Sequence, residues 1–338
     1  MMAEKKTTFG LTSSNRALVT RGTTPKDLID MAVLAERTGA VDAIWVGDSI
    51  LSKPRLECIP LLGAIAGRTS RVKLGVACMA TIAQRNPVLL ALQWASLDVL
   101  SGGRAWLAAC MGYPASQHPM AAKELEVMGV TSKERPGRME EMIQALRLLW
   151  SEEHASFQGK YYSFDDVNLL PKPLQRPCPV YIAGTPRAAQ IGEPGVDRAL
   201  RRIARYADGW MSNQIELAMF KDYQGRLREM VTDEGRDPNA FKTVLYYGVS
   251  VNRDREQAFR EAKAFLDAYY QKDFTREGVE IWTACGPVER CVDCLRGFID
   301  AGVDHVAIRP IGADLNQQFV IFLEKLVPAL QAVTDKAA

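Results

Sequence analysis

Apolar residues recur along the chain in two alternating patterns, which predict short strands followed by amphipathic helices. Runs rich in apolar and β-branched residues predict eight strands, near Thr8–Leu11, Ala43–Val46, Lys73–Cys78, Ala105–Ala109, Val180–Ala183, Gly209–Met211, Val244–Val251 and His305–Ile308. Apolar positions at helical spacing predict helices between them, most clearly over Asp27–Thr38, Pro87–Val99, Arg138–Trp150, Val196–Tyr206, Phe220–Glu234, Arg255–Gln271 and Pro287–Ala301.

Eight strands that each precede a helix favour a (β/α)8 TIM barrel, an α/β fold, over a doubly wound sheet. No G-x-G-x-x-G motif follows the first strand, which weakens the dinucleotide-binding alternative. A bare barrel needs about 250 residues, and the chain has 338. We therefore expect residues 1–338 to form one barrel domain with insertions at about 113–179 and 183–196. The first insertion is expected to carry a helix and a hairpin within Ser156–Asn168.

The charge balance argues against several classes of partner. The chain has 42 Lys and Arg against 40 Asp and Glu, a net charge of +2, and no basic block. We therefore expect neither nucleic acid nor a membrane surface as a partner. Residues Met1–Thr8 lack the apolar core of a secretory signal, and no apolar run approaches the roughly 20 residues of a membrane helix. These features predict a cytoplasmic protein.

The seven cysteines are an odd number in scattered apolar surroundings, which predicts free thiols in a reducing compartment. Cys291 and Cys294 share a helix face near Cys285. A zinc site needs a fourth ligand, and there is no second C-x-x-C motif to supply it. We interpret these cysteines as buried helix thiols and expect no metal site.

The predicted C-terminal strand ends, where a barrel places its chemistry, are poor in acid–base groups. They offer small residues, hydroxyls, the thiol of Cys110 and the phenol of Tyr113, but no carboxylate pair. Such a pocket suits a planar cofactor that brings its own chemistry. Gly184 and Thr185 follow the fifth strand, where backbone N–H groups and a hydroxyl can bind a phosphate.

Five sequence blocks resemble one family. They span nearly the whole chain and occur along it in the family's order. The most specific is PVLLALQWASLDVLSGGRAWLAACMGY (Pro87–Tyr113), a helix ending in L-D-x-L-S-x-G-R before a strand that closes on a glycine-containing turn. The others are AERTGAVDAIWVGDS (Ala35–Ser49), YIAGT (Tyr181–Thr185), RRIARYADGW (Arg201–Trp210) and FIDAGVDHV (Phe298–Val306). Together they resemble the bacterial luciferase-like flavin-dependent oxidoreductases.

The resemblance implies a (β/α)8 barrel that binds reduced FMN or the deazaflavin F420 across the strand C-termini. It implies a set of cofactor contacts at Cys78, Met79, Met111, Gly112, Gly184, Thr185 and Asn213. Cys78 and Met79 would lie beside the flavin ring, with a non-proline cis peptide near Ala77–Cys78. Gly184 and Thr185 match the phosphate-binding turn, and Asn213 would face the ring or the ribityl chain.

Two departures from the family pattern affect the expected activity. Many members have a Glu/Asp–His pair after the second strand, whereas this chain has Gly47, Asp48 and Ser49. Met111 stands where luciferases have an arginine that grips phosphate. These departures put luciferase activity in doubt and leave the choice between FMN and F420 open.

The candidates for catalysis and substrate binding are few. Cys110 matches a thiol beside the ring in luciferases, and it either reacts or packs there. His118 is the histidine placed after the fourth strand to give or take a proton. Ser49, Tyr113 and Arg309 are expected to contact substrate, with an ion pair at the barrel rim as the alternative for Arg309.

The leading hypothesis is a two-component monooxygenase that uses reduced FMN and O2 on a small organic substrate, with a separate flavin reductase as partner. The alternative is an F420-dependent hydride-transfer oxidoreductase, whose longer cofactor needs a basic groove such as Arg187, Arg198, Arg201 and Arg202 could form. A non-catalytic flavin-binding protein is the second alternative. A homodimer or higher homo-oligomer is expected.

Overall fold

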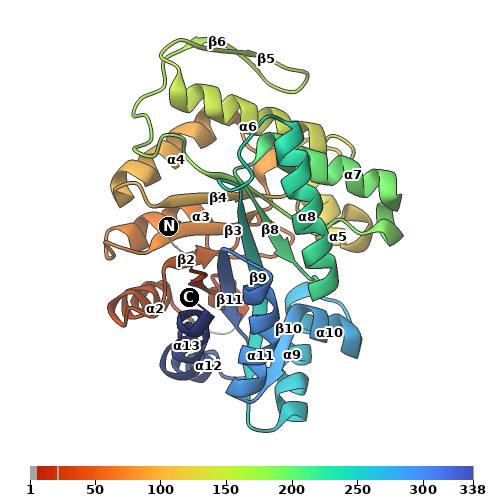
Figure 1. Cartoon of the computed structure of the whole chain (residues 1–338). Coiled ribbons are helices and arrows are strands. Elements are labelled where there is room, and N and C mark those ends of the chain that lie inside the picture. Colours follow the sequence, from red (N-terminus) through yellow and green to blue (C-terminus); the bar gives the residue numbers. More distant parts are fainter. Residues whose placement is uncertain (1–5, 21–22, 338) are drawn as a thin grey trace.

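The protein is a closed parallel barrel of eight strands surrounded by helices, in a computed structural model that describes residues 6–20 and 23–337 (Figure 1). The barrel strands, in their order around the ring, are β1 (Thr8–Thr12), β2 (Ala43–Val46), β3 (Lys73–Met79), β4 (Ala105–Ala109), β7 (Val180–Ala183), β8 (Gly209–Asn213), β9 (Lys242–Val251) and β11 (His305–Pro310). Pairing of β8 with β9 and of β11 with β1 closes the ring. The expected (β/α)8 fold is confirmed.

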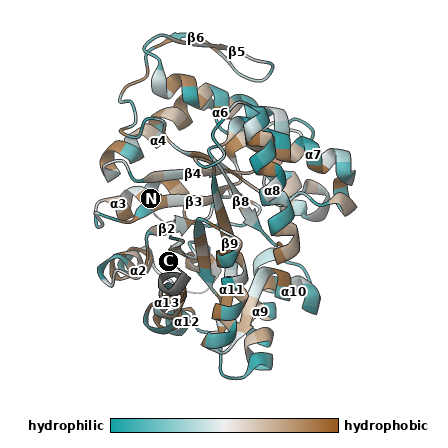
Figure 2. Ribbon diagram, in the orientation of Figure 1, coloured by the Kyte–Doolittle hydropathy of each residue, from teal (hydrophilic) through white to brown (hydrophobic). Residues whose placement is uncertain are grey.

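Helices cover the outside of the barrel, and their apolar faces pack on the strands (Figure 2). They are α1 (Ala17–Thr20), α2 (Pro25–Arg37), α3 (Cys58–Ala66), α4 (Pro87–Ser101), α5 (Pro119–Val127), α6 (Arg135–Ser151), α7 (Ala188–Tyr206), α8 (Leu217–Asp233), α9 (Arg255–Tyr270), α10 (Arg276–Trp282), α11 (Val288–Asp300), α12 (Leu315–Ile321) and α13 (Val327–Ala337). None of the helices in the described part of the chain is long and apolar enough to cross a membrane.

Local sequence signals set the ends of α4. The Asn86 side chain accepts a hydrogen bond from the Leu89 N–H, and Pro87 occupies the first turn, where its missing N–H costs nothing. Gly102 ends the helix with φ of 68°, a left-handed conformation that glycine adopts without strain. This helix therefore delivers the chain to β4 and the turn that follows it.

Two segments outside the regular repeat differ in how well the sequence predicted them. Between β4 and β7 lie α5, α6 and the antiparallel hairpin of β5 (Ala155–Gln158) and β6 (Ser163–Val167), which agrees with the hairpin expected within Ser156–Asn168. Between β9 and β11 lie α10 and a short ninth strand, β10 (Thr283–Gly286), which the pattern did not predict. This second segment supplies part of the wall of the cavity described below.

The N-terminal end of the barrel is filled by large side chains. Trp45, Trp106 and His305 lie with ring centroids 5.5 to 5.7 Å apart, and Tyr181 packs 5.8 Å from Trp106. A side chain at Gly10 would meet both the His305 and the Trp45 rings, so glycine is required there. These side chains fill the N-terminal end, and the cavity described below lies at the C-terminal ends of the strands.

Candidate functional site

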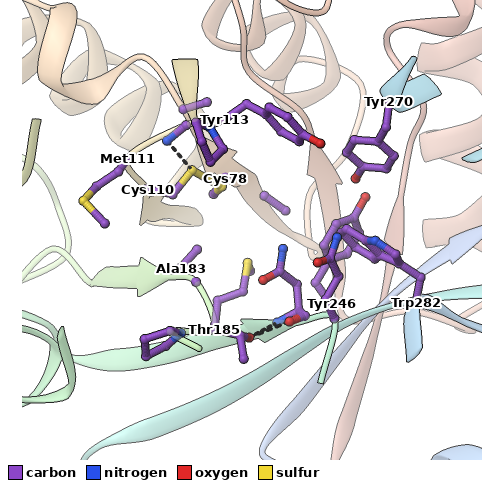
Figure 3. Close-up of a pocket in the computed structure, with 18 of the residues that line it drawn as sticks. Cys78, Cys110, Met111, Tyr113, Ala183, Thr185, Tyr246, Tyr270 and Trp282 are labelled. Atoms are coloured by element: carbon purple, nitrogen blue, oxygen red, sulfur yellow. Dashed lines mark hydrogen bonds between the residues drawn. A yellow bond between two sulfur atoms is a disulfide. The ribbon is translucent and has the colours of Figure 1, made fainter. Parts of the chain in front are cut away.

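A cavity of about 620 Å³ lies at the C-terminal ends of the barrel strands (Figure 3). Eight of the residues predicted for the site line it, namely Cys78, Cys110, Met111, Gly112, Tyr113, Gly184, Thr185 and Asn213. Met111, Ala183 and Thr185 lie toward one side of the view and Tyr246, Tyr270 and Trp282 toward the other, with Tyr113 above Cys78 in the middle. The cavity therefore has a polar end near β7 and β8 and an aromatic end across from it.

The middle of the cavity wall is built by the ends of β3 and β4. The peptide bond between Ala77 and Cys78 is cis, as the resemblance implied. Cys78 and Cys110 are joined in a disulfide with their Cα atoms 5.9 Å apart. The prediction that all seven cysteines are free thiols is therefore wrong for this pair, and Cys110 has no free thiol to react. Neighbouring strand ends bring the two together, which the sequence separation of 32 residues does not reveal.

Met79 is placed differently from the expectation. Its side chain is fully buried in the hydrophobic core and does not line the cavity. Successive side chains of a strand point to opposite faces, so Cys78 and Met79 cannot both face the cavity. Cys78 faces it, and Met79 packs beneath the surrounding helices.

The polar end of the cavity is formed by the turns after β7 and β8. The Thr185 hydroxyl donates to the Asn213 carbonyl and accepts from the Asn213 N–H, so the two turns are tied together. The Gly184 N–H donates to the Met211 carbonyl, so it is not available to a phosphate. A side chain at Gly184 would meet nothing within 4 Å, which leaves open space beside the backbone. Only part of the predicted phosphate cradle is therefore free.

The cavity extends past Thr185 to two arginines near α7. Arg187 and Arg202 line it, whereas Arg198 and Arg201 are exposed and do not. Arg202 pairs with Glu140, and Arg187 lies 3.5 Å from a carboxylate oxygen of Glu216. Half of the basic groove expected for a longer cofactor thus borders the cavity.

His118 and Ser49, predicted for proton transfer and substrate contact, do not line the cavity. His118 is buried with its ring 5.6 Å from the Tyr113 ring, and burial together with nearby Lys53 lowers its pKa. The Ser49 hydroxyl bonds to Ser52 and to Glu124 on α5. Both residues were placed correctly near strand ends, but loops turn their side chains away from the opening.

Arg309 is also set back from the cavity, and it forms no ion pair with any carboxylate in the described part of the chain. It donates to the Tyr246 hydroxyl at 3.0 Å and to the Ser14 hydroxyl at 3.3 Å. Its guanidinium carbon lies 4.0 Å from the centre of the Tyr269 ring. Neither the expected substrate contact nor the alternative ion pair describes it.

The sequence interpretation missed Lys53, Arg55, Tyr269 and Tyr270, all of which line the cavity. Lys53 and Arg55 lie in the loop after β2, and two cations within nine residues of a barrel strand's C-terminal end were the available signal. The two tyrosines end α9, and nothing local indicates that this helix reaches the cavity. Burial lowers the pKa of Lys53 to about 8, so Lys53 Nζ is a cavity group that can gain or lose a proton near neutral pH.

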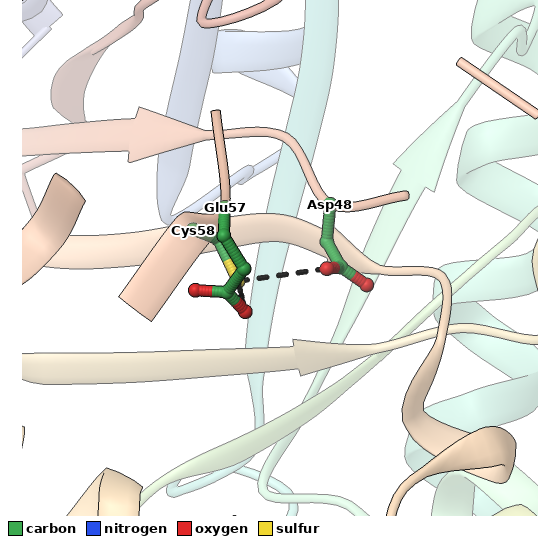
Figure 4. A group of neighbouring side chains, drawn as sticks. All are labelled: Asp48, Glu57 and Cys58. Carbon is green, nitrogen blue, oxygen red and sulfur yellow. Dashed lines mark hydrogen bonds between the residues drawn. The ribbon is translucent and has the colours of Figure 1, made fainter. Parts of the chain in front are cut away.

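Asp48, Glu57 and Cys58 form a cluster of metal-ligand type beside the cavity (Figure 4). Arg85 lies 2.9 Å from an oxygen of each carboxylate, and the Thr81 N–H and hydroxyl donate to Asp48. Burial and the two carboxylates raise the pKa of the Cys58 thiol well above its usual range, so the thiol stays protonated. The guanidinium already neutralises this cluster, which favours a structural role.

A family model described as luciferase-like monooxygenase matches residues 7–305. Among curated proteins, the F420-dependent glucose-6-phosphate dehydrogenase of Nakamurella multipartita is 26% identical, with 92% of this chain and 94% of that protein covered. The enzyme of the same name from Amycolatopsis mediterranei is 27% identical, with 91% and 96% covered.

Solved structures agree in fold. An F420-dependent secondary alcohol dehydrogenase in complex with an F420-acetone adduct has a TM-score of 0.78 at 20% identity, covering 96% of this chain and 99% of that one. The monooxygenase RslO1 from Streptomyces bottropensis has a TM-score of 0.76 at 19% identity, covering 95% and 99%. Since the family model spans most of the barrel, the chain belongs to the luciferase-like monooxygenase family and is an oxidoreductase of that family.

Proposed function

We propose that the chain is an F420-dependent oxidoreductase that acts on a small organic molecule. The observation that carries this proposal is the continuation of the cavity past Thr185 to Arg187 and Arg202. FMN ends at its phosphate, whereas F420 carries further negative charge beyond it, for which Arg187 and Arg202 would exchange their pairs with Glu216 and Glu140. The F420-dependent relatives of similar length support the same choice, and they favour the alternative over the leading hypothesis of an FMN monooxygenase.

The residues at the cavity wall fit such a cofactor. Cys78, Met111 and Ala183 offer flat, largely apolar surface for a ring, and open space at Gly184 admits a phosphate beside the backbone. F420, when bound, supplies hydride transfer to or from the substrate. The protein supplies position, and the rings of Tyr246, Tyr270 and Trp282 keep water from the far end of the cavity.

The test is a titration of the purified full chain with F420, FMN and reduced FMN, followed by fluorescence or calorimetry. We expect F420 to bind at least tenfold more tightly than either form of FMN. The deazaflavin chromophore without phosphate and tail serves as the matched control, and it should bind more weakly than F420. Tight binding of reduced FMN with consumption of O2, and no binding of F420, would overturn the proposal.

A further inference from the structure

Positive charge is concentrated at one side of the barrel mouth. Lys53 and Arg55 follow β2, and Arg309 lies in β11. We refer to Lys53, Arg55 and Arg309 as the cation cluster. In the ring of eight strands, β11, β1 and β2 are neighbours, and β7 lies across the barrel from β1. The cation cluster therefore faces the polar end, with Gly184 and Thr185, from the opposite side of the cavity.

The cluster is organised around Tyr269. Arg55 Nη2 donates to the Tyr269 hydroxyl at 2.9 Å, and the Arg309 guanidinium stacks on the Tyr269 ring. Lys53 Nζ lies 4.5 Å from the centre of the Tyr270 ring and 5.0 Å from that of Tyr113. Burial raises the pKa of Tyr269, but the three cations outweigh it and hold that pKa well below its usual range.

Acidic side chains do not balance this charge. Within the described part of the chain, no carboxylate forms an ion pair with Lys53, Arg55 or Arg309. The two carboxylates that line the cavity are engaged elsewhere, Asp48 with Arg85 and Asp273 with Lys263. Even with Tyr269 ionised, one phenolate faces three cations. Uncompensated buried charge is costly, so an arrangement of this kind is typical of a site for an anion.

The loop that presents Lys53 and Arg55 is held in place. Glu124 of α5 accepts hydrogen bonds from the N–H groups of Ile50, Leu51 and Ser52, immediately before Lys53. Arg55 Nε donates to the Lys53 carbonyl at 2.9 Å. A side chain at Gly47 would overlap the Arg55 guanidinium, so glycine allows that close approach. Both cations are therefore fixed at the cavity wall rather than free at its rim.

The wall next to the cluster is aromatic. Tyr270 stacks on Trp282 with ring centroids 5.3 Å apart, and Tyr246 meets Trp282 edge-on at 6.0 Å. Such rings pack against a flat or apolar body, and they offer few partners for the hydroxyls of a sugar. Two cations at the wall suit the two oxygens of a carboxylate.

We propose that Lys53 and Arg55 of the cation cluster, with Arg309 set back from the cavity as a supporting charge, bind the carboxylate of a small organic acid whose aromatic or apolar body lies against Tyr270 and Trp282. The proposal names the substrate class of the proposed oxidoreductase and rests on that function for its catalytic meaning. The anion is held across the cavity from the cofactor's phosphate, so the body of the acid lies between the two ends.

The experiment measures binding to the full chain without cofactor, by calorimetry, with phenylacetate, neutral phenylacetamide, inorganic phosphate and glucose 6-phosphate as probes. We expect phenylacetate to bind at least tenfold more tightly than the amide and than either phosphate. Lys53→Met should weaken phenylacetate at least tenfold, and Lys53→Arg should restore most of the affinity. Lys160→Met is the matched control, because Lys160 also lies over a tyrosine ring, 5.2 Å from that of Tyr161, but outside the cavity.

Three results would overturn the proposal. The first is equal affinity for phenylacetate and phenylacetamide. The second is tighter binding of inorganic phosphate or glucose 6-phosphate than of phenylacetate. The third is an unchanged affinity for phenylacetate in Lys53→Met, in a variant whose thermal unfolding shows that the fold is intact. Titration of the unmutated chain with F420 and with phenylacetate separates the two proposals. Phenylacetate binding with no F420 binding would contradict only the proposed cofactor, and F420 binding with no carboxylate binding only the proposed substrate class.

Discussion

Lys53 is a half-buried cation in the cavity wall that forms no ion pair with a described carboxylate, which leads to a prediction about stability. Burial, with help from Arg55 and Arg309, lowers the pKa of Lys53 to about 8, although Tyr269 opposes the shift. The unfolded chain keeps that proton up to about pH 10.4. Between pH 8 and 10 the unfolded state therefore binds more protons, and the free energy of unfolding rises with pH by about 2 kcal/mol from this group.

In Lys53→Met this rise is absent, and the variant is more stable than the wild type at pH 7. Urea unfolding from pH 7 to 10 measures both effects, with Lys160→Met as the control that follows the wild-type curve. If the Lys53→Met and wild-type curves run parallel over this range, Lys53 carries no such penalty in the fold.

Gly184 gives a second prediction at the scale of one residue. Its φ of 147° strains any other residue, but a side chain there would find open space. Gly184→Ala tests the strain alone, whereas Gly184→Asp adds a negative charge beside the proposed phosphate position. We expect the aspartate variant to bind F420 at least tenfold more weakly than the alanine variant, as measured by fluorescence titration. Equal affinities would place the phosphate elsewhere.

The sequence located some site residues and not others for a physical reason. Gly184 and Thr185 directly follow β7, and Asn213 is the last residue of β8, so the strand ends fix where these residues lie. Lys53 lies seven positions after the last residue of β2, so its place depends on a loop held by a distant helix. His118 is close to β4 in sequence, but its ring turns behind Tyr113. Strand ends are therefore predictable and loop side chains are not.

At the scale of elements, α5 acts on the cavity through one carboxylate. Burial raises the pKa of Glu124, but the N–H groups of Ser52, Leu51 and Ile50 and the amide of Gln84 hold it below its usual value. A buried acceptor of several backbone donors is expensive to remove, because the donors are left without partners. Glu124 thus positions Lys53 without touching the cavity itself.

We expect Glu124→Ala to lower the free energy of unfolding by about 2 to 4 kcal/mol and to weaken phenylacetate binding severalfold. Glu124→Gln keeps one acceptor oxygen and should lose less of both. F420 affinity measured on the same samples should change little, since α5 does not border the polar end. A loss of F420 binding equal to that of phenylacetate would instead indicate a general loosening of the barrel mouth.

The predictable elements are those with a strong local signal. The barrel strands are runs such as Leu107–Ala109 in β4, buried on both faces, and their apolar character stands out. β10 is only Thr283–Gly286, and its composition resembles a turn. It forms because it pairs with the C-terminal half of β9, Gly248–Val251. This tertiary contact cannot be predicted from a single sequence. Tyr113 was predicted to lie at the cavity, but Tyr246, Tyr270 and Trp282 of its aromatic wall were not.

Across the whole molecule, the two ends of the barrel differ in how they treat charge. The mouth concentrates cations, whereas the base holds His305 without charge among Trp45, Trp106 and Thr8. The Trp45 Nε1–H donates to His305 Nε2 at 3.0 Å, which fixes that nitrogen as an acceptor. Burial lowers the pKa of His305 to about 3.

This difference predicts acid sensitivity that begins at the closed base. The unfolded chain protonates His305 below about pH 6.5, while the folded chain does not until about pH 3. The stability contributed by this group is therefore complete above pH 6.5. It falls as the pH drops, by about 2 kcal/mol between pH 6.5 and 5.

His305→Gln keeps an acceptor for the Trp45 N–H and removes the titrating imidazole. We expect this variant to start less stable at pH 7 but to lose less stability on acidification, in urea unfolding at pH 7, 6 and 5. His154→Gln is the control, because His154 is exposed on the β5–β6 hairpin. If His305→Gln and the wild type lose equal free energy of unfolding on acidification, the acid-sensitive group is not His305 and lies elsewhere than the barrel base.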